Sequence, residues 1–165
     1  MLKGVGAESS MSPAIAKTLV PATAHPVVSG IEETDHRLNI SVVFTSIEPT
    51  LMALKEAGTL ANRLGARITL LVPQLVPHPL PLDSPPVLVE FNERRFRVIA
   101  GQSTVETQVH VYLCRDRFQT LTSVLGPGSI VVLGGRKRRW WPTRDEALAK
   151  ELKRAGFEVI FKQTE

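Results

Sequence analysis

The residues of this chain whose types and spacing best suit binding chemistry lie between an apolar run and a helix-cap motif near the C-terminus. Residues 130–133 are apolar, and they are followed by Gly134, Gly135, four cations, two tryptophans and Thr143. Paired glycines let a ligand approach the backbone closely, and free amides at a helix N-terminus attract anions. Arginine can bind a phosphate through two hydrogen bonds at once. The segment therefore predicts a phosphate site.

Two hydroxyl side chains that follow an earlier apolar run belong to the same predicted site, because hydroxyls there can bind a ribose or a phosphate. The predicted phosphate or nucleotide site comprises Thr45, Ser46, Gly134, Gly135, Arg136, Lys137 and Thr143. Trp140 or Trp141 would stack on a base. The alternative is that the tryptophans cover the end of the sheet or a dimer surface, that the cations are solvated, and that Ser46 only caps a helix.

The remaining chemistry-bearing residues do not form a recognisable constellation. The four histidines are scattered along the sequence, and none has a cysteine or carboxylate partner at the spacing of a metal site. The lone Cys114 lies beside Arg115 and Arg117, which can lower a thiol pKa, but a lone cysteine at a strand end is more often inert. Since the sequence also lacks a P-loop and a Gly-x-Ser-x-Gly elbow, we predict no catalytic residues, no metal site and no enzyme.

Strand and helix patterns alternate around these residues. Short apolar or β-branched runs predict five strands, at residues 40–45, 66–72, 104–114, 129–133 and 157–161. Apolar stripes with caps predict four helices, at residues 48–64, 84–101, 116–125 and 143–155. Such alternation requires right-handed parallel crossovers. We predict an α/β fold: an open five-stranded parallel sheet in the order 3-2-1-4-5, with helices on both faces.

Three local patterns refine this prediction. The proline-dense segment 73–86 excludes a central strand and predicts an extended connection. The strand at 104–114 alternates apolar and polar residues, which places it at an edge of the sheet. The strand at 129–133 is nearly all apolar and therefore central. The switch point then lies between the first and fourth strands, where the loops 45–50 and 134–142 meet.

The N-terminal part of the chain differs in composition from the rest. Residues 1–38 are rich in Ala, Ser, Thr, Pro and Gly, so we predict a flexible extension before an α/β domain at 39–165. Hydrophobic residues at 43% and a net charge of +4 are ordinary for a soluble globular protein. No apolar stretch is long enough to span a bilayer, and a single cysteine fits a reducing compartment. We expect a cytoplasmic protein without a membrane partner.

In the order and length of these elements, residues 38–165 resemble the universal stress protein family. The likeness includes the turn before the first helix, the proline-bearing loop after the second strand and the Ile-Val-Val-Leu-Gly run at 130–134. In nucleotide-binding members of that family, the fourth strand is followed by Gly-x-x-Gly, nine residues and Gly-Ser/Thr, and the first strand ends in Asp.

This sequence keeps little of that nucleotide motif. Gly134 matches the first glycine, and Lys137 takes the place of the second. Ala147 and Leu148 replace the closing pair, and Thr45 or its neighbour stands at the position of the Asp. The resemblance therefore implies the fold, together with an ATP site that has been lost or remodelled.

Three hypotheses about function follow. The first is a non-enzymatic cytoplasmic module of the stress-response type that needs no cofactor. Because the family often dimerises along its last strand, we expect a homodimer through the edge strand 157–161, with a further protein partner also open. The second is a sensor that binds ATP or another nucleotide through the loop from Gly134 to Thr143. The third is a nucleic-acid-associated protein, which the mixed charge of the remaining sequence disfavours.

Overall fold

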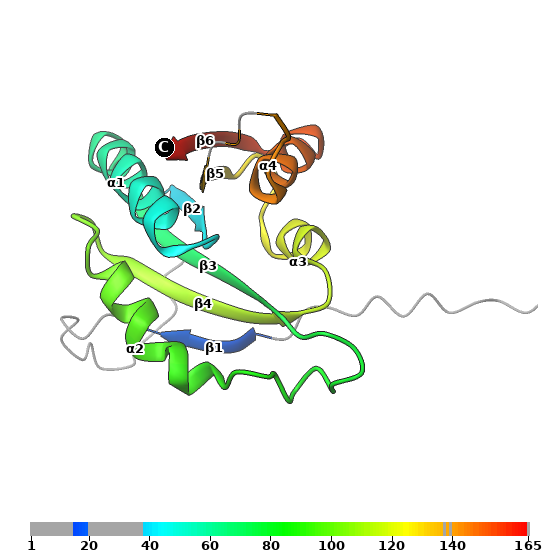
Figure 1. Cartoon of the computed structure of the whole chain (residues 1–165). Helices are drawn as coiled ribbons and strands as arrows, with labels where there is room; N and C mark the ends of the chain where they lie inside the picture. Colours follow the sequence, from blue (N-terminus) through cyan, green and yellow to red (C-terminus); the bar gives the residue numbers. More distant parts are fainter. Residues whose placement is uncertain (1–14, 20–37, 137, 139, 165) are drawn as a thin grey trace, which may run out of the picture.

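The computed structural model describes residues 15–19, 38–136, 138 and 140–164, with the backbone alone at 15–19 and 89–93. Within these residues, six strands form one sheet in the order β1-β4-β3-β2-β5-β6 (Figure 1). The elements in chain order are β1 (Ile15–Leu19), β2 (Asn39–Val43), α1 (Ile47–Leu64), β3 (Arg67–Leu75), α2 (Val89–Ala100), β4 (Thr107–Cys114), α3 (Arg117–Val124), β5 (Ile130–Arg136), α4 (Arg144–Arg154) and β6 (Glu158–Thr164).

The five strands from β4 to β6 in this order pair in parallel, which confirms the predicted fold and strand order. Strands β2 and β5 lie side by side in the middle, with Val42 opposite Val132. Both of these valines are fully buried, because helices cover both faces of the sheet. Strands β3 and β4 lie on one side of β2, whereas β5 and β6 lie on the other side. The direction of the helical crossover therefore reverses between β2 and β5, as predicted.

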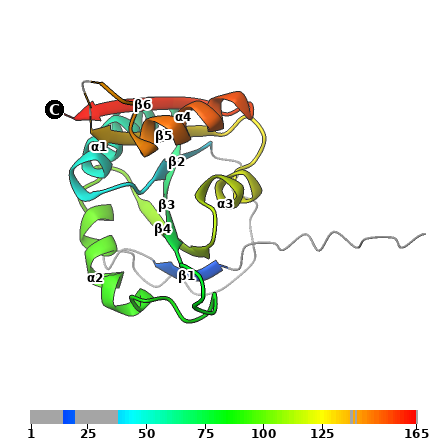
Figure 2. The same ribbon diagram turned by 45° about the vertical axis from the view of Figure 1, so that its right-hand side comes forward.

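The helices divide between the two faces of the sheet. Helices α1 and α2 lie on one face and α3 and α4 on the other (Figure 1). On α1, the buried residues Leu54, Ala57 and Ala61 recur at helical spacing and pack into the first core. Leu121 of α3 and Leu152 of α4 belong to the second core. Figure 2 shows α4 lying along β5 and β6.

Three helix ends form where the sequence predicts them. Gly65 ends α1 in the left-handed region at φ 62°, which a residue with a Cβ rarely adopts. The Asp116 carboxylate accepts a hydrogen bond from the Gln119 amide at 2.8 Å at the start of α3. The Thr143 hydroxyl oxygen accepts one from the Glu146 amide at 3.2 Å at the start of α4. The predicted start of α4 is confirmed.

Strand β1 corrects the predicted edge position of the strand at 104–114, because it pairs antiparallel with β4. The strand at 104–114 is not at the edge, and five residues within the predicted flexible extension 1–38 form a strand. Residues 1–14 and 20–37 lie outside the described part of the chain. The alternation in β4 reflects unequal covering of its two faces: Val109 is fully buried, whereas His110 is only partly so.

Strand β3 extends into the segment that its prolines seemed to exclude. Pro73 is buried within β3 and pairs with β4. The Phe44 amide donates to the Leu71 carbonyl at 2.8 Å, so residues of that parity face β2. Two residues further on, Pro73 faces the place where β2 has already ended. The missing N–H of the proline therefore removes no hydrogen bond from the ladder.

The long connection between β3 and α2 ends later than predicted. Helix α2 begins at Val89 and not at Ser84, because the Ser84 amide donates to the Pro81 carbonyl at 3.1 Å within a turn. Two side chains hold the connection in place. Arg115 donates to the carbonyls of Val76 and Leu80, and the Gln74 amide donates to that of Val87 at 2.6 Å.

Gly134 and Gly135, which the sequence places in the loop 134–142, are part of β5. Gly134 pairs with Lys162 and Gly135 with Gln163, so the strand continues to Arg136. A Cβ on Gly134 would overlap with the carbonyl oxygen of Pro49 in the first turn of α1. A Cβ on Gly135 would lie 2.5 Å from the Phe161 ring. These glycines make room for the protein's own packing.

We predict that Gly134→Ala lowers the free energy of unfolding by about 1–3 kcal/mol or more, because the first turn of α1 must move away from β5. Urea denaturation measures the change. Gly126→Ala is the matched control, since a Cβ there meets only the Ser129 hydroxyl at 3.6 Å. Equal stability of the two variants would contradict the close packing of α1 on Gly134.

Candidate functional site

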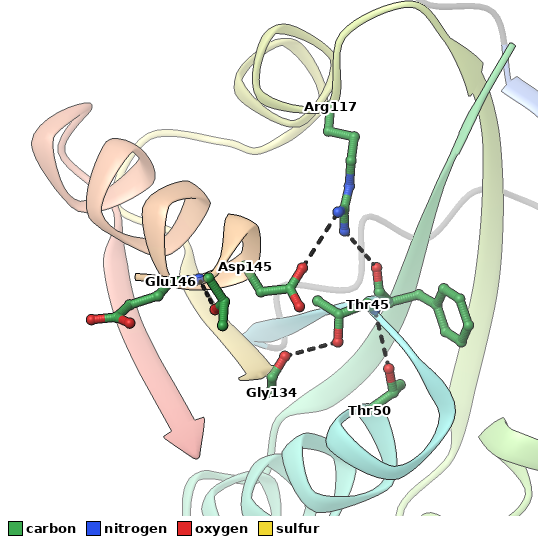
Figure 3. Close-up of polar contacts among 8 residues, drawn as sticks. Thr45, Thr50, Arg117, Gly134, Asp145 and Glu146 are labelled. Atoms are coloured by element: carbon green, nitrogen blue, oxygen red, sulfur yellow. Dashed lines mark hydrogen bonds and ion pairs between the residues drawn. The ribbon is translucent and has the colours of Figure 1, made fainter. Parts of the chain in front are cut away.

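The candidate site lies at the carboxyl ends of β2 and β5, where the crossover direction reverses. Thr45 follows β2 and joins the two strands (Figure 3). Its hydroxyl donates to the Gly134 carbonyl at 2.8 Å, and its amide donates to the Thr50 hydroxyl oxygen at 3.2 Å. Thr45 and Gly134, 89 positions apart in the sequence, therefore lie together at this end of the sheet, but their polar groups bind each other.

Arg117 is the centre of the polar contacts at this site, and sequence reasoning did not assign it there. From the start of α3, its Nη2 donates to the Phe44 carbonyl at 2.9 Å, and its Nη1 lies 3.5 Å from the Asp145 carboxylate (Figure 3). Both charged side chains are only 24% exposed. The Arg117 Nε is buried without a hydrogen-bond partner among the described residues. The guanidinium thereby connects α3 and α4 to the end of β2.

The N-terminus of α4 is stabilised by its own cap residue and by acidic side chains of its first turn. Thr143 caps the helix through the Glu146 amide, and Asp145 and Glu146 are both in the first turn. Two carboxylates there interact favourably with the positive end of the helix dipole. Glu146 also lies 3.2 Å from the Lys150 ammonium. A phosphate approaching this helix end would meet negative charge as well as free amides.

The other predicted site residues lie around this centre. Ser46 is exposed at the start of α1 and makes no side-chain capping bond within the described structure. Arg136 is also exposed, and its Nη2 lies 3.3 Å from the Glu48 carboxylate. Lys137 lies outside the described residues. The structure therefore brings Thr45, Gly134 and Thr143 to one end of the sheet, while Arg136 contacts α1.

The two tryptophans of the loop between β5 and α4 are among the most exposed apolar side chains described. Trp140 is 81% and Trp141 77% exposed. The interpretation that they cover the end of the sheet is therefore wrong for the single chain. Arg138, which precedes them, is exposed as well.

Two titratable side chains of β4, His110 and Cys114, have pKa values that are shifted by burial. Burial lowers the pKa of His110, whose Nδ1 lies 3.5 Å from the Tyr112 hydroxyl. Burial also raises the pKa of the Cys114 thiol, and a hydrogen bond with Thr120 and the nearby Arg117 charge only partly offset this effect. Cys114 therefore stays protonated at neutral pH, which makes it a poor nucleophile.

No protein-family model matches this chain, and no curated protein matches it either. Within the described residues, no group of three or more His, Cys, Asp or Glu side chains is placed to hold a metal ion. Among the described helices, none combines the length and the apolar character that crossing a membrane requires.

We predict that Arg117→Met lowers the free energy of unfolding by about 1–3 kcal/mol, because the Phe44 carbonyl and the Asp145 carboxylate each lose a donor. Arg117→Lys should recover only part of the loss, since one ammonium cannot reproduce the planar fork. Urea denaturation of both variants measures this, with the exposed Arg154→Met as control. Full recovery by lysine would show that charge alone, and not the two-partner geometry, matters.

Proposed function

We propose that the protein is a non-enzymatic α/β module, similar to the universal stress proteins, that acts in the cytoplasm by associating with other macromolecules. One observation carries this proposal: the groups that a phosphate site would need contact other parts of the protein instead. Gly134 accommodates the first turn of α1, and the Thr45 hydroxyl is bound to the Gly134 carbonyl. Thr143 is bound to the first turn of α4.

The charges at this end of the sheet support the same conclusion. The carboxylates of Glu48, Asp145 and Glu146 lie beside the predicted phosphate position, and Arg136 and Arg117 already contact two of them. The Arg117–Asp145 pair is largely removed from solvent, so an entering phosphate would have to compete with a partly buried carboxylate. The ATP site of the resembled family is, in this proposal, replaced by side-chain contacts.

A nucleotide sensor is the second candidate, and the exposure of Arg136 favours it. The Arg136 and Glu48 side chains are 68% and 73% exposed, so their ion pair contributes little and a ligand phosphate can displace it. Such a ligand would sit outside the Thr45–Gly134 contact, on the loop that leads to Thr143.

We predict that ATP does not raise the melting temperature of the purified protein, and that native mass spectrometry finds no co-purifying nucleotide. A thermal-shift titration measures the first expectation. An ATP-dependent rise that disappears in the double variant Arg136→Ala, Lys137→Ala would instead establish the nucleotide sensor.

The proposed homodimer uses the backbone of β6, which pairs only with β5 among the described strands. The Glu158 amide donates to the Ser129 carbonyl at 3.1 Å, so residues of that parity face β5. By alternation, Val159, Phe161 and Gln163 direct their backbone N–H and C=O groups away from β5. Such an unpaired edge can continue into the same edge of a second chain.

We predict that Gln163→Pro weakens the homodimer, because proline removes one N–H that the partner strand would use, while leaving the bonds to β5 intact. Sedimentation equilibrium measures the dissociation constant, with Gln163→Ala as the matched control. The alanine variant should dimerise like the original chain. If the proline variant dimerises equally well, the interface lies elsewhere.

A further inference from the structure

The loop between β5 and α4 presents cations and tryptophans to solvent at one place. We define the arginine–tryptophan loop as Arg136, Arg138, Trp140 and Trp141, all of which are exposed. The two indoles are 81% and 77% exposed, so most of their apolar surface is in contact with water. Scattered single apolar residues on a surface are ordinary, but two neighbouring exposed tryptophans beside arginines indicate a contact surface.

The chemistry of this loop matches a repeating pattern of negative charge and flat aromatic rings. A single strand of DNA or RNA repeats one phosphate and one base along its length. Arginine guanidinium groups bind phosphates, and indole rings stack on bases of any sequence. We propose that the arginine–tryptophan loop binds single-stranded nucleic acid, with Arg136 and Arg138 on the phosphates and Trp140 and Trp141 on unpaired bases.

The surroundings of the loop favour a short single strand over other anionic surfaces. In a duplex, the base faces are stacked on one another and are closed to an indole. A membrane would bring lipid against the start of α1 as well, where Glu48 is 73% exposed and lies 3.3 Å from Arg136. A single strand needs only the loop itself.

The overall charge of the chain supports attraction without a continuous groove. The net charge is +4 and the pI about 9.6, yet Glu48, Asp145 and Glu146 border the loop on both sides. The footprint is therefore short. With the two phosphates bound by Arg136 and Arg138 neutralised, the logarithm of the association constant should fall with the logarithm of salt concentration at a slope of about −1.4.

The test uses the full chain and a fluorescein-labelled oligothymidylate of about 15 nucleotides, which exceeds the footprint of a small binding surface. Fluorescence anisotropy at two or more salt concentrations gives the dissociation constant and the slope. Trp140 and Trp141 are the only tryptophans of the chain, so intrinsic fluorescence reports on this loop alone. Base stacking should quench it on titration with unlabelled oligonucleotide.

Matched variants separate stacking from charge. The double variant Trp140→Leu, Trp141→Leu keeps an apolar surface but removes the flat rings, and it should weaken binding at least about tenfold. Trp140→Phe with Trp141→Phe keeps smaller rings and should retain most of the affinity. Arg136→Ala with Arg138→Ala should reduce both the affinity and the salt slope.

The control for charge is Arg63→Ala with Arg154→Ala, which removes the same charge from the last turns of α1 and α4. These turns lie at the opposite end of the sheet, so the loss of the two charges should leave binding nearly unchanged. The proposal is overturned if the oligonucleotide does not bind, or if both arginine pairs weaken binding equally. It is also overturned if fluorescence is unaffected, or if phosphatidylglycerol vesicles bind through this loop while the oligonucleotide does not. This test is independent of the homodimer and of the ATP titration.

Discussion

The close packing of the first turn of α1 on β5 is the constraint on which the rest of this end of the molecule depends. Because Gly134 has no side chain, the backbone at Pro49 can approach the strand directly. The Thr45 hydroxyl then reaches the Gly134 carbonyl, and Thr50 reaches the Thr45 amide. With α1 this close, β2 and β5 are joined beyond their last ladder bond. In many α/β sheets, the same position is left open for a ligand.

A second set of contacts stabilises the same end of the sheet on the face covered by α3 and α4. Arg117 reaches from α3 across the end of β2 to Asp145 on α4, so that three elements share one guanidinium. Its hydrogen bonds are made at low solvent exposure, where polar contacts are stronger and unpaired groups cost more. This arrangement fixes α3, α4 and the end of β2 relative to one another through the contacts of one side chain.

The charged and aromatic side chains that remain accessible to a partner therefore lie on the surface. Arg136, Arg138, Trp140 and Trp141 extend from the end of β5 to the start of α4, with charge and aromatic surface in contact with solvent. At the other side of β5, the edge of β6 carries backbone groups that face away from the sheet. Both features favour binding between surfaces, and the proposed function of association rests on them.

Much of the fold follows from the sequence alone. Apolar runs that alternate with apolar helical stripes predicted the five parallel strands and their order. Gly65, Asp116 and Thr143 marked the ends of helices, because their side chains or backbone freedom suit a helix cap. These features depend on residues a few positions apart, so the sequence displays them. It also displays the composition and the cluster of arginines and tryptophans, because these are properties of the chain itself.

The tertiary structure decided what the glycines and charges at the site do. Glycine is favoured in turns and depleted in strands, and only the close approach of Pro49 and Phe161 accounts for Gly134 and Gly135 within β5. Pro73 enters β3 because β2 ends beside it. Arg117 meets the Phe44 carbonyl, 73 positions away, through the packing of α3 on the sheet. Contacts between distant segments have no local pattern, because they arise from the packing of whole elements and not from the preferences of neighbouring residues.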